Sequence, residues 1–266
     1  MNYQEILNQV IELAKQVGTF QKNNMFKADL SIDTKSTETD LVTEIDKKSD
    51  EMILNHIRTH FPGHSVLTEE SGESDLHSDY RWVIDPLDGT TNFAQGLPIF
   101  TVSIALQHKG QTVLGVVYNP VVGDLFTAIQ GNGAYRNGQR ITVSKKTSLK
   151  SSVLATGFPY DIAQNPVNNL AYFNHLSIKA RAVRRFGSAA YDLALVADGR
   201  FDGYWEMALN PWDVAAGLLL VEEAGGKIVH FRNDRKISLI AGNETLCGLI
   251  LRELREMASQ DGRQAN

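Results

Sequence analysis

The sequence predicts a layered α/β (α+β) fold in which residues 1–266 form a single domain with two sub-layers of sheet, approximately 1–150 and 151–266. Strand-like and helix-like stretches alternate in the first half of the chain and again in the second. No low-complexity linker separates the two halves. The chain is also long enough to bury a substantial core, because 42% of its 266 residues are hydrophobic.

Two amphipathic helices are expected near the start of the chain. Apolar residues recur at helical spacing over about 3–19, and Gly18 is the expected stop of this first helix. A second helix is expected after Asp40, and the Pro-Gly break within 60–64 ends it. Asp46 lies beside the apolar stripe of the second helix. Because Asp is seldom fully buried, its position alone favours a solvated flank.

The remaining elements follow from apolar runs and from turn residues. We expect strands at 65–68, 81–84, 98–106, 112–118, 124–129, 152–155, 182–186 and 201–206, and helices at about 166–178, 187–197 and 211–225. The glycine-rich stretch at 131–138 follows a meander and opens no helix, so we reject it as a dinucleotide loop. The three histidines at helical spacing are interpreted as surface residues, not zinc ligands: His56, His60 and His64.

The composition argues against some classes of binding partner and indicates a cellular compartment. The net charge is −5 with both signs interspersed, which argues against nucleic acid as an electrostatic partner. The longest apolar run, 214–221, is too short to cross a membrane. The single cysteine, Cys247, lies in an apolar run and is expected in the core. With no signal-peptide pattern at the start, these features predict a cytoplasmic protein.

The most informative stretch is Trp82–Phe93. An apolar strand runs directly into Asp85 and Asp88, and Pro86 between them is expected to take the chain out of a central ladder. Two carboxylates at a strand end, followed by the turn-forming Gly89, suit a hard cation such as Mg²⁺, Ca²⁺ or Mn²⁺. An isolated motif of this kind is equally compatible with ordinary turn chemistry.

Other acidic residues also follow predicted strands or begin predicted helices. Glu69 follows the strand at 65–68, and Glu206 ends the strand at 201–206. Asp213 falls in the first turn of a helix, where the helix dipole favours a carboxylate for purely structural reasons. The helix that starts near Gly187 presents free backbone amides, which form a natural seat for an anion.

Taken together, these residues resemble the inositol monophosphatase family, a group of magnesium-dependent and lithium-sensitive phosphatases, in its bacterial form. The resemblance covers about residues 5–250 through separated motifs in the family's order: Asp40–Asp46, Glu69–Ser71, Trp82–Phe93, Gly187–Ala189 and Trp212–Gly217. It implies the αβαβα sandwich shared with fructose-1,6-bisphosphatase, usually assembled as a homodimer.

The resemblance implies two to three Mg²⁺ ions. Glu69, Asp85 and the carbonyl of Leu87 correspond to ligands of the first ion. Asp85, Asp88 and Asp213 correspond to ligands of the second, and Glu69 also touches a third, weaker site. Under this resemblance Asp213 is a ligand as well as a residue of a helix first turn.

The resemblance also assigns catalytic and substrate-binding roles. Thr90, oriented by Asp46, corresponds to the pair that positions and activates the attacking water, and Glu69 completes the catalytic set. The amides of Gly89 and Thr90 would hold phosphate oxygens. The positions that would contact sugar or inositol hydroxyls are Asp88, Ala189, Glu206 and Asp213.

The implied activity is hydrolysis of a small phosphorylated substrate, inositol 1-phosphate, by direct in-line attack of a metal-activated water. Clustered cations would offset the repulsion between a phosphate dianion and its nucleophile and would stabilise the leaving oxygen. Residues 91–93 and Glu206 resemble the inositol branch. The alternatives within the same fold are fructose 1,6-bisphosphate, the 2′-phosphate of NADP, histidinol phosphate and 3′-phosphoadenosine 5′-phosphate.

Two other classes of protein are also weighed as alternatives. A haloacid-dehalogenase phosphatase would need its acid pair two residues apart, whereas Asp85 and Asp88 are three apart. A non-catalytic binding or regulatory protein could keep the same fold. Lys35 resembles a residue at the active-site mouth. Arg184 and Arg185 fit either a second phosphate or a dimer interface, and the dimer interface is preferred.

Overall fold

The structure, a computed structural model, describes residues 1–26, 32–34 and 41–260. Its helices are α1 (Tyr3–Asn24), α2 (Glu44–His60), α3 (Thr90–Ala94), α4 (Leu170–Ser177), α5 (Ala189–Ala197), α6 (Pro211–Glu223) and α7 (Glu244–Gln260). Its first ten strands are β1 (Ile32–Thr34), β2 (Leu41–Thr43), β3 (Ser65–Thr68), β4 (Gly72–Ser74), β5 (Tyr80–Asp88), β6 (Thr101–His108), β7 (Gln111–Asn119), β8 (Asp124–Ile129), β9 (Gly133–Arg136) and β10 (Gln139–Arg140). The others are β11 (Val153–Thr156), β12 (Ala182–Arg184), β13 (Gly203–Leu209), β14 (Lys227–Arg232) and β15 (Ile237–Gly242).

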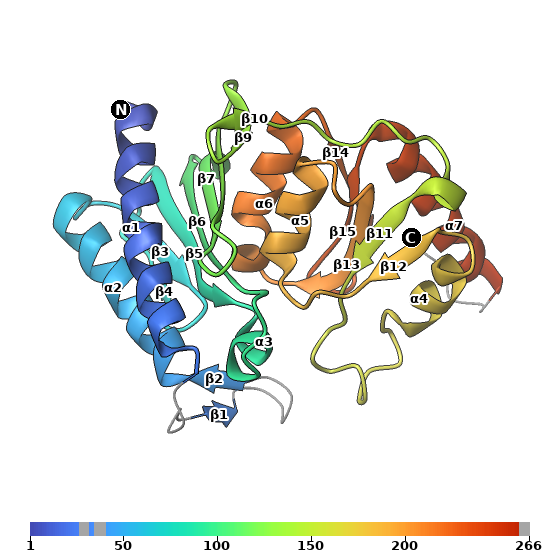
Figure 1. Ribbon diagram of the computed structural model, residues 1–266, viewed down its shortest axis with the longest axis horizontal. Coiled ribbons are helices and arrows are strands. Elements are labelled where there is room, and N and C mark those ends of the chain that lie inside the picture. Colours follow the sequence, from blue (N-terminus) through green and yellow to red (C-terminus); the bar gives the residue numbers. More distant parts are fainter. Residues whose placement is uncertain (27–31, 35–40, 261–266) are drawn as a thin grey trace.

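Helices and sheets alternate in five layers across the molecule (Figure 1). α1 and α2 cover one face of an eight-stranded sheet of order β10-β9-β8-β7-β6-β5-β3-β4. α5 and α6 lie between this sheet and a five-stranded sheet of order β12-β11-β13-β15-β14. α4 and α7 cover the far face of the second sheet. The predicted αβαβα sandwich is therefore confirmed.

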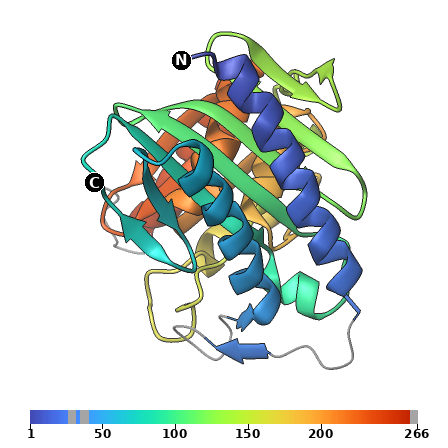
Figure 2. The same ribbon diagram turned by 90° about the vertical axis from the view of Figure 1, so that its left-hand side faces the viewer.

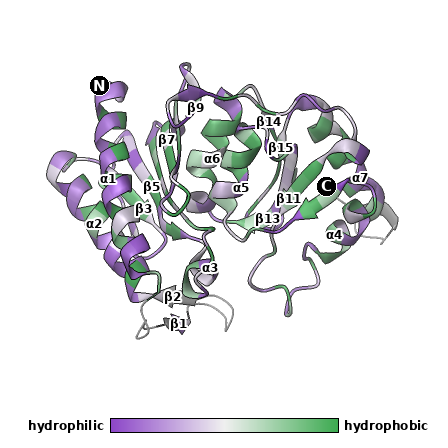
Figure 3. Cartoon of the chain, viewed as in Figure 1, coloured by the Kyte–Doolittle hydropathy of each residue, from purple (hydrophilic) through white to green (hydrophobic). Residues whose placement is uncertain are grey.

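The hydropathy of each helix matches its layer. α5 and α6, which are covered by a sheet on each side, are mostly hydrophobic, whereas α1 and α2 carry hydrophilic residues on their outer surface (Figure 3). The turned view shows α1 and α2 lying side by side across the strands of the first sheet (Figure 2). None of the helices in the described part of the chain is long and apolar enough to cross a membrane.

The first helix is longer than the sequence indicated. α1 continues past Gly18 to Asn24 because this glycine provides close packing and does not end the helix. A Cβ at position 18 would lie 2.7 Å from Cε1 of Tyr118 and 2.8 Å from Cβ of Pro120. Gly18 thus lets α1 approach the end of β7, and the prediction that it stops the helix was wrong.

Other elements agree with the sequence to different degrees. The strand at 65–68 and the strand at 124–129 have the predicted bounds, and Cys247 is fully buried as expected. β14, β15 and α7 had no counterpart in the sequence prediction, which assigned no helix or strand beyond residue 225. β15 pairs with β13, from which α6 and β14 separate it in the sequence, and β14 pairs with β15.

Gly217 lets α5 and α6 pack closely between the sheets, which gives a test of the buried layer. A Cβ at position 217 would lie 2.7 Å from Cβ of Leu193. We expect Gly217→Ala to lower the free energy of unfolding by about 1–3 kcal/mol through overpacking. Gly248→Ala on the exposed side of α7 is the control, because no atom lies within 4 Å of its Cβ position. It should raise the free energy of unfolding by up to about 1 kcal/mol. Urea unfolding measures both values, and shifts of the same sign would contradict the packing argument.

Candidate active site

A bulge in β5 carries the first two predicted ligands. The pairing of β5 with β6 shifts by one residue between Asp85 and Asp88, so the strand bends where Pro86 has no amide to donate. The sequence suggested that the chain leaves the sheet at Pro86. This was wrong, because the strand resumes pairing at Asp88. Oδ1 of Asp85 accepts a hydrogen bond of 3.1 Å from the amide of Leu87, and both residues are buried.

Gln21 supports this bulge from α1, on the turn that the sequence prediction did not include. Its Nε2 donates to the carbonyl of Pro86 at 2.7 Å and to Oγ of Ser49 at 3.1 Å, and the residue is fully buried. A buried amide without partners would destabilise the fold, so these bonds fix the relative positions of α1, α2 and β5. The signal in the sequence was a polar residue that continues the apolar stripe four positions after Val17.

Asp46, Thr90 and the Leu87 carbonyl form a buried hydrogen-bonded group. Oγ1 of Thr90 lies 2.7 Å from Oδ1 of Asp46 and 3.2 Å from the carbonyl oxygen of Leu87. Oδ2 of Asp46 accepts from the amide of Thr43 at 2.8 Å and from its hydroxyl. With Asp46 only 1% exposed, the solvated flank expected from helical position alone was wrong. The capping box at the start of α2 turns the carboxylate inward, towards Thr90.

Gly89 links β5 to α3 in a conformation that favours glycine. Its φ is 102°, and a Cβ would lie 2.9 Å from the carbonyl oxygen of Ile99 and 3.3 Å from that of Gly187. The amides of Gly89 and Thr90, predicted to hold phosphate oxygens, therefore belong to a turn that is closely packed against backbone from both halves of the chain.

Asp88 connects the first half of the chain to the start of α5. Its Oδ2 accepts from Oγ of Ser188 and from the amide of Ala190, each at 2.7 Å, and its Oδ1 accepts from the amide of Ala189 at 3.3 Å. The anion that the sequence led us to expect at this helix N-terminus is thus the carboxylate of Asp88 itself. This contact also places Ala189 beside Asp88, as the resemblance predicted.

Asp213 and Glu206 reach the same region from the second half of the chain. Oδ2 of Asp213 accepts from the amide of Asn210 at 2.7 Å, so Asp213 has the first-turn position that the sequence indicated. Oε2 of Glu206 accepts from the hydroxyl of Tyr204. The carboxylate of Glu206 packs directly on Gly157, where a Cβ would lie only 2.2 Å from Oε1. A side chain at position 157 would therefore displace Glu206.

Two adjoining cavities open beside these acids. The outer cavity has a volume of about 690 Å³ and is lined by Glu69, Glu206 and Asp213, with aromatic walls from Phe158, Tyr160 and Trp212. The inner cavity, of about 80 Å³, is lined by Asp88, Ala189, Glu206 and Asp213 together with Arg185 and Asp192. The two share Glu206 and Asp213 and so form one continuous site.

The predicted site residues therefore divide into two groups. Those at the cavity walls are Glu69, Asp88, Ala189, Glu206 and Asp213. Those that line neither cavity are Asp46, Asp85, Leu87, Gly89 and Thr90. The last four form the strand end and turn next to Asp88, and Asp46 on α2 is hydrogen-bonded to Thr90. Lys35 lies outside the described residues. Both arginines, Arg184 and Arg185, are exposed. Arg185 lines the inner cavity, which places it at the site, whereas Arg184 lines neither cavity and donates to the carbonyl of Val183.

The carboxyl groups at the cavities hold their protons more tightly than usual. Burial raises the pKa of Asp88 to about 6, although hydrogen bonds from Ser188 and the α5 amides oppose the shift. Burial also raises the pKa of Glu206 to about 7. The pKa of Asp213 is well above its ordinary value, through burial first and repulsion from Glu69 second. The site therefore gathers several carboxyl groups, and their potential negative charge, in a buried place that disfavours ionisation.

This charge and the donor set fit a hard divalent cation. All the predicted ligand atoms are carboxylate or carbonyl oxygens, which Mg²⁺ prefers, and a divalent ion would stabilise the ionised forms that burial disfavours. Among the described residues, no three acidic, histidine or cysteine side chains are already grouped to hold an ion. Asp88 is instead turned towards α5, and a ligand role would require it to share that contact.

Removal of Mg²⁺ should make stability depend on pH in a defined direction. Because the folded pKa of Asp88 lies above 3.8, the metal-free protein should lose stability as pH rises from about 4 to about 6. Mg²⁺ binds the ionised form, so its stabilising effect on Tm should be larger near pH 8 than near pH 6. Thermal unfolding with Mg²⁺ or with a chelator measures this difference. An equal Mg²⁺ effect at both pH values would contradict it.

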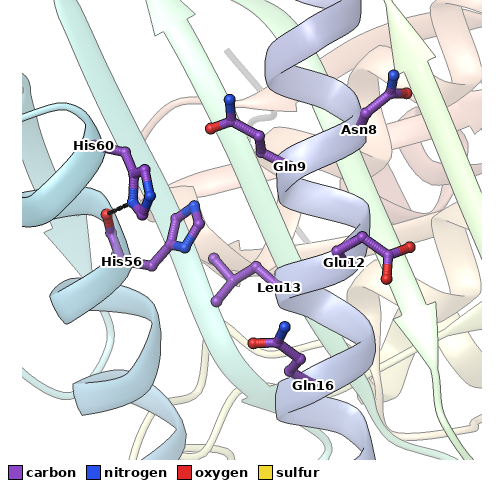
Figure 4. A pocket seen from close by; sticks show the side chains of 7 residues that line it. All are labelled: Asn8, Gln9, Glu12, Leu13, Gln16, His56 and His60. Carbon is purple, nitrogen blue, oxygen red and sulfur yellow. Dashed lines mark hydrogen bonds between the residues drawn. The ribbon is translucent and has the colours of Figure 1, made fainter.

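The histidines form no part of this site. A separate cavity of about 490 Å³ lies between α1 and α2, with His56 and His60 on one side and Glu12 on the other (Figure 4). The rings of His56 and His60 stack with 4.2 Å between centroids. His60 is exposed. His56 and His64 are partly exposed, and Nδ1 of His64 accepts from Nε1 of Trp82 at 3.1 Å.

Three further residues at the site escaped the sequence prediction. Gly157 seats Glu206, and Asn92 joins the two halves through Nδ2, which donates to the carbonyls of Ile99 at 2.8 Å and Phe186 at 2.7 Å. Asp192 is an acid inside the otherwise apolar α5, and that contrast was its signal. Gly157 and Asn92 had no local signal, because their partners are distant in sequence.

Comparisons with known proteins agree with this geometry. Residues 2–259 match the profile described as "Inositol monophosphatase family". The chain is 41% identical over 259 residues to a protein of Escherichia coli strain K12 named Nus factor SuhB, covering 96% of this chain and 97% of that protein. It is 40% identical over 225 residues to a Mesorhizobium japonicum inositol-1-monophosphatase, covering 83% and 85%.

A solved structure shows the same arrangement. The inositol monophosphatase of Anabaena superposes with a TM-score of 0.85 at 41% identity, covering 96% of this chain and 97% of that one. The match therefore extends over both sheets and the site between them. This chain belongs to the inositol monophosphatase family.

Proposed function

We propose that the protein is a Mg²⁺-dependent phosphomonoester hydrolase that converts inositol 1-phosphate and water to inositol and phosphate. One observation carries the proposal: the buried Asp46–Thr90 hydrogen bond of 2.7 Å lies at the same strand end as Asp85 and Asp88. In this proposal the general base for water and the oxygen ligands would share one location, and membership of the family supports the assignment.

Thr90 and Asp46 would position and deprotonate the attacking water. Oγ1 of Thr90 directs its hydrogen towards Oδ1 of Asp46, which leaves oxygen lone pairs available to accept from water. As water attacks phosphorus in line with the leaving oxygen, its proton would pass to Oγ1 while the Thr90 proton moves to Asp46. Thr43 holds the other Asp46 oxygen and so fixes the carboxylate in the orientation that this transfer needs.

The metal-binding and substrate-binding roles follow from the predicted set. Glu69, Asp85, Asp88, Asp213 and the Leu87 carbonyl would hold two to three Mg²⁺ ions, which when bound would neutralise phosphate charge and stabilise the leaving oxygen. The amides of Gly89 and Thr90 would accommodate phosphate oxygens. The wall of the inner cavity that carries Ala189 and Glu206 would receive the hydroxyl groups of the substrate.

Phosphate release from a panel of substrates, with and without Mg²⁺, tests this proposal. The panel contains inositol 1-phosphate, fructose 1,6-bisphosphate, NADP, histidinol phosphate and 3′-phosphoadenosine 5′-phosphate. We expect Mg²⁺-dependent release, fastest from inositol 1-phosphate, and a different best substrate would assign another branch of the same chemistry. Absence of release from every substrate would overturn the enzymatic proposal.

Several relatives carry the name Nus factor SuhB, which favours a second candidate, a binding role as a Nus factor. This candidate would add a macromolecular partner to the small substrate. Replacement of the E. coli relative by this chain, either unaltered or as Asp88→Asn, separates the two roles. Equal replacement by both forms would indicate a binding role that needs no hydrolysis. Replacement by the unaltered chain alone would indicate that hydrolysis is required.

We further propose that the chain forms a single domain that assembles as a homodimer, acts in the cytoplasm and is inhibited by Li⁺. These expectations rest on the family resemblance and on composition. Sedimentation equilibrium gives the mass in solution, and a Li⁺ titration of phosphate release tests the inhibition.

A further inference from the structure

Asp192 is a buried acid that the proposed mechanism does not use. It lies one turn into α5, is 1% exposed, and its Oδ1 has no hydrogen-bond partner among the described residues. Nearly all buried polar groups in folded proteins have a partner, so an orphaned carboxyl oxygen requires an explanation. Asp192 also lines the inner cavity, between the α5 N-terminus and Glu206.

The surroundings of Asp192 fit a ligand better than they fit a structural role. Burial raises the pKa of Asp192 well above the ordinary value, and repulsion from Glu206 on β13 and Asp88 on β5 adds to this effect. Arg185 is the opposing cation, and it forms no ion pair with either Asp192 or Glu206 within 4.0 Å. All three side chains line the inner cavity of about 80 Å³.

We propose that Asp192 is a further substrate-binding residue, which together with Glu206 recognises hydroxyl groups of a polyol substrate in the inner cavity. This inference rests on the proposed function, because it specifies which part of the substrate the site binds. A protonated carboxyl both donates and accepts, which is the complement of an alcohol. The inner cavity has room for the hydroxyl-bearing edge of a ring, and the remainder would occupy the outer cavity.

Two carboxyls in one small cavity also explain a preference between substrates. A site built to hydrogen-bond a substrate hydroxyl discriminates against analogues that lack it, because its buried polar groups are then left unpaired. A phosphomonoester with a flat leaving group that has no hydroxyl would form no hydrogen bond with Asp192, so this carboxyl would stay unpaired as in the ligand-free protein. Asp192 should therefore affect polyol phosphates and have no effect on p-nitrophenyl phosphate.

The test compares Asp192→Leu and Asp192→Asn with the unaltered protein, using myo-inositol as the probe. The control is Asp198→Asn, because Asp198 ends the same helix and pairs with Arg136 and Arg200 away from the cavity. Calorimetric titration should show the Kd for myo-inositol rising about tenfold in Asp192→Leu, since one hydrogen bond is lost. Asp192→Asn keeps an acceptor and a donor and should bind within about threefold of the unaltered protein.

Kinetics supply the second measurement. For Asp192→Leu we expect the kcat/KM of inositol 1-phosphate to fall about tenfold, mainly through KM, with that of p-nitrophenyl phosphate unchanged. Its Tm should be unchanged or raised, because an unpaired buried carboxyl is removed. Equal losses for both substrates, or an unaltered Kd for myo-inositol, would overturn the proposal. If Asp192→Leu does not fold by near-UV circular dichroism, Asp192→Ala replaces it with the same expected results.

The two proposals fail in distinguishable ways. If no phosphomonoester is hydrolysed but myo-inositol binds and Asp192→Leu weakens it, the enzymatic proposal is wrong and the hydroxyl-binding role stands. If hydrolysis occurs but myo-inositol does not bind the unaltered protein, the role of Asp192 is wrong and the enzymatic proposal stands.

Discussion

Asp88→Asn should lower Mg²⁺-dependent phosphate release by on the order of a thousandfold, because several kcal/mol of transition-state stabilisation depend on the cations that Asp88 would hold. The fold should survive. The amide retains one oxygen to accept from Ser188 and the start of α5, and the buried charge that raises the pKa of Asp88 to about 6 is removed. Turnover at saturating Mg²⁺ and Tm with and without Mg²⁺ measure the two effects.

The expected signature is loss of both turnover and the Mg²⁺-induced rise in Tm, with little change in the Tm of the metal-free protein. Asp79→Asn is a matched control, because Asp79 immediately precedes β5 at its opposite end and its side chain forms an exposed pair with Lys109. It should retain full activity. Normal turnover by Asp88→Asn would remove Asp88 from the catalytic machinery, and equal losses in both variants would point to a general effect of charge.

Thr90→Val should lower kcat by about 10²–10⁴-fold, the usual contribution of a positioned general base. Valine has a shape close to that of threonine but cannot accept from water or donate to Asp46, whose Oδ1 lies 2.7 Å from Oγ1 of Thr90. The Mg²⁺-induced rise in Tm should persist, because Thr90 supplies no predicted metal ligand through its side chain. Steady-state kinetics and thermal unfolding separate these outcomes.

Two further variants make this result specific. Thr90→Ser keeps the hydroxyl and should recover most of the activity, whereas Thr91→Val alters an exposed neighbour on α3 and should have no effect. Full activity in Thr90→Val would show that the Asp46–Thr90 pair is structural only. A fall in kcat that Thr90→Ser does not restore would indicate that backbone geometry at the turn matters more than the hydroxyl.

Short stretches of sequence correctly predicted those helices and strands whose bounds depend only on their own residues. β3 and β8 have the predicted bounds because a short apolar run between turn residues has few other options. α6 begins at Pro211, as proline at a first helical position indicates. The αβαβα sandwich and the family also followed from the sequence, because the recognised motifs lie in order along nearly the whole chain.

Local pattern failed where a contact between distant segments decides the outcome. Helical position placed Asp46 on a solvated flank, but Thr90, 44 residues later, buries it by a hydrogen bond. Gly18 has the usual appearance of a helix stop, yet its missing side chain serves packing against Tyr118. Neither partner is visible in the stretch of sequence around the residue.

The sequence by itself therefore determined the chemical types at the site: carboxylates at strand ends, a threonine after a glycine turn, and an acid in a helix first turn. Their spacing follows from strand and turn geometry within a few residues. Only the tertiary structure decided what each one faces. The carboxylate of Asp88 reaches α5, about a hundred residues away, and Asp192 on α5 lines the same cavity as Glu206 on β13. Packing of the two sheets around α5 and α6 creates these contacts, because burial and hydrogen-bond pairing act between segments that the local pattern does not relate.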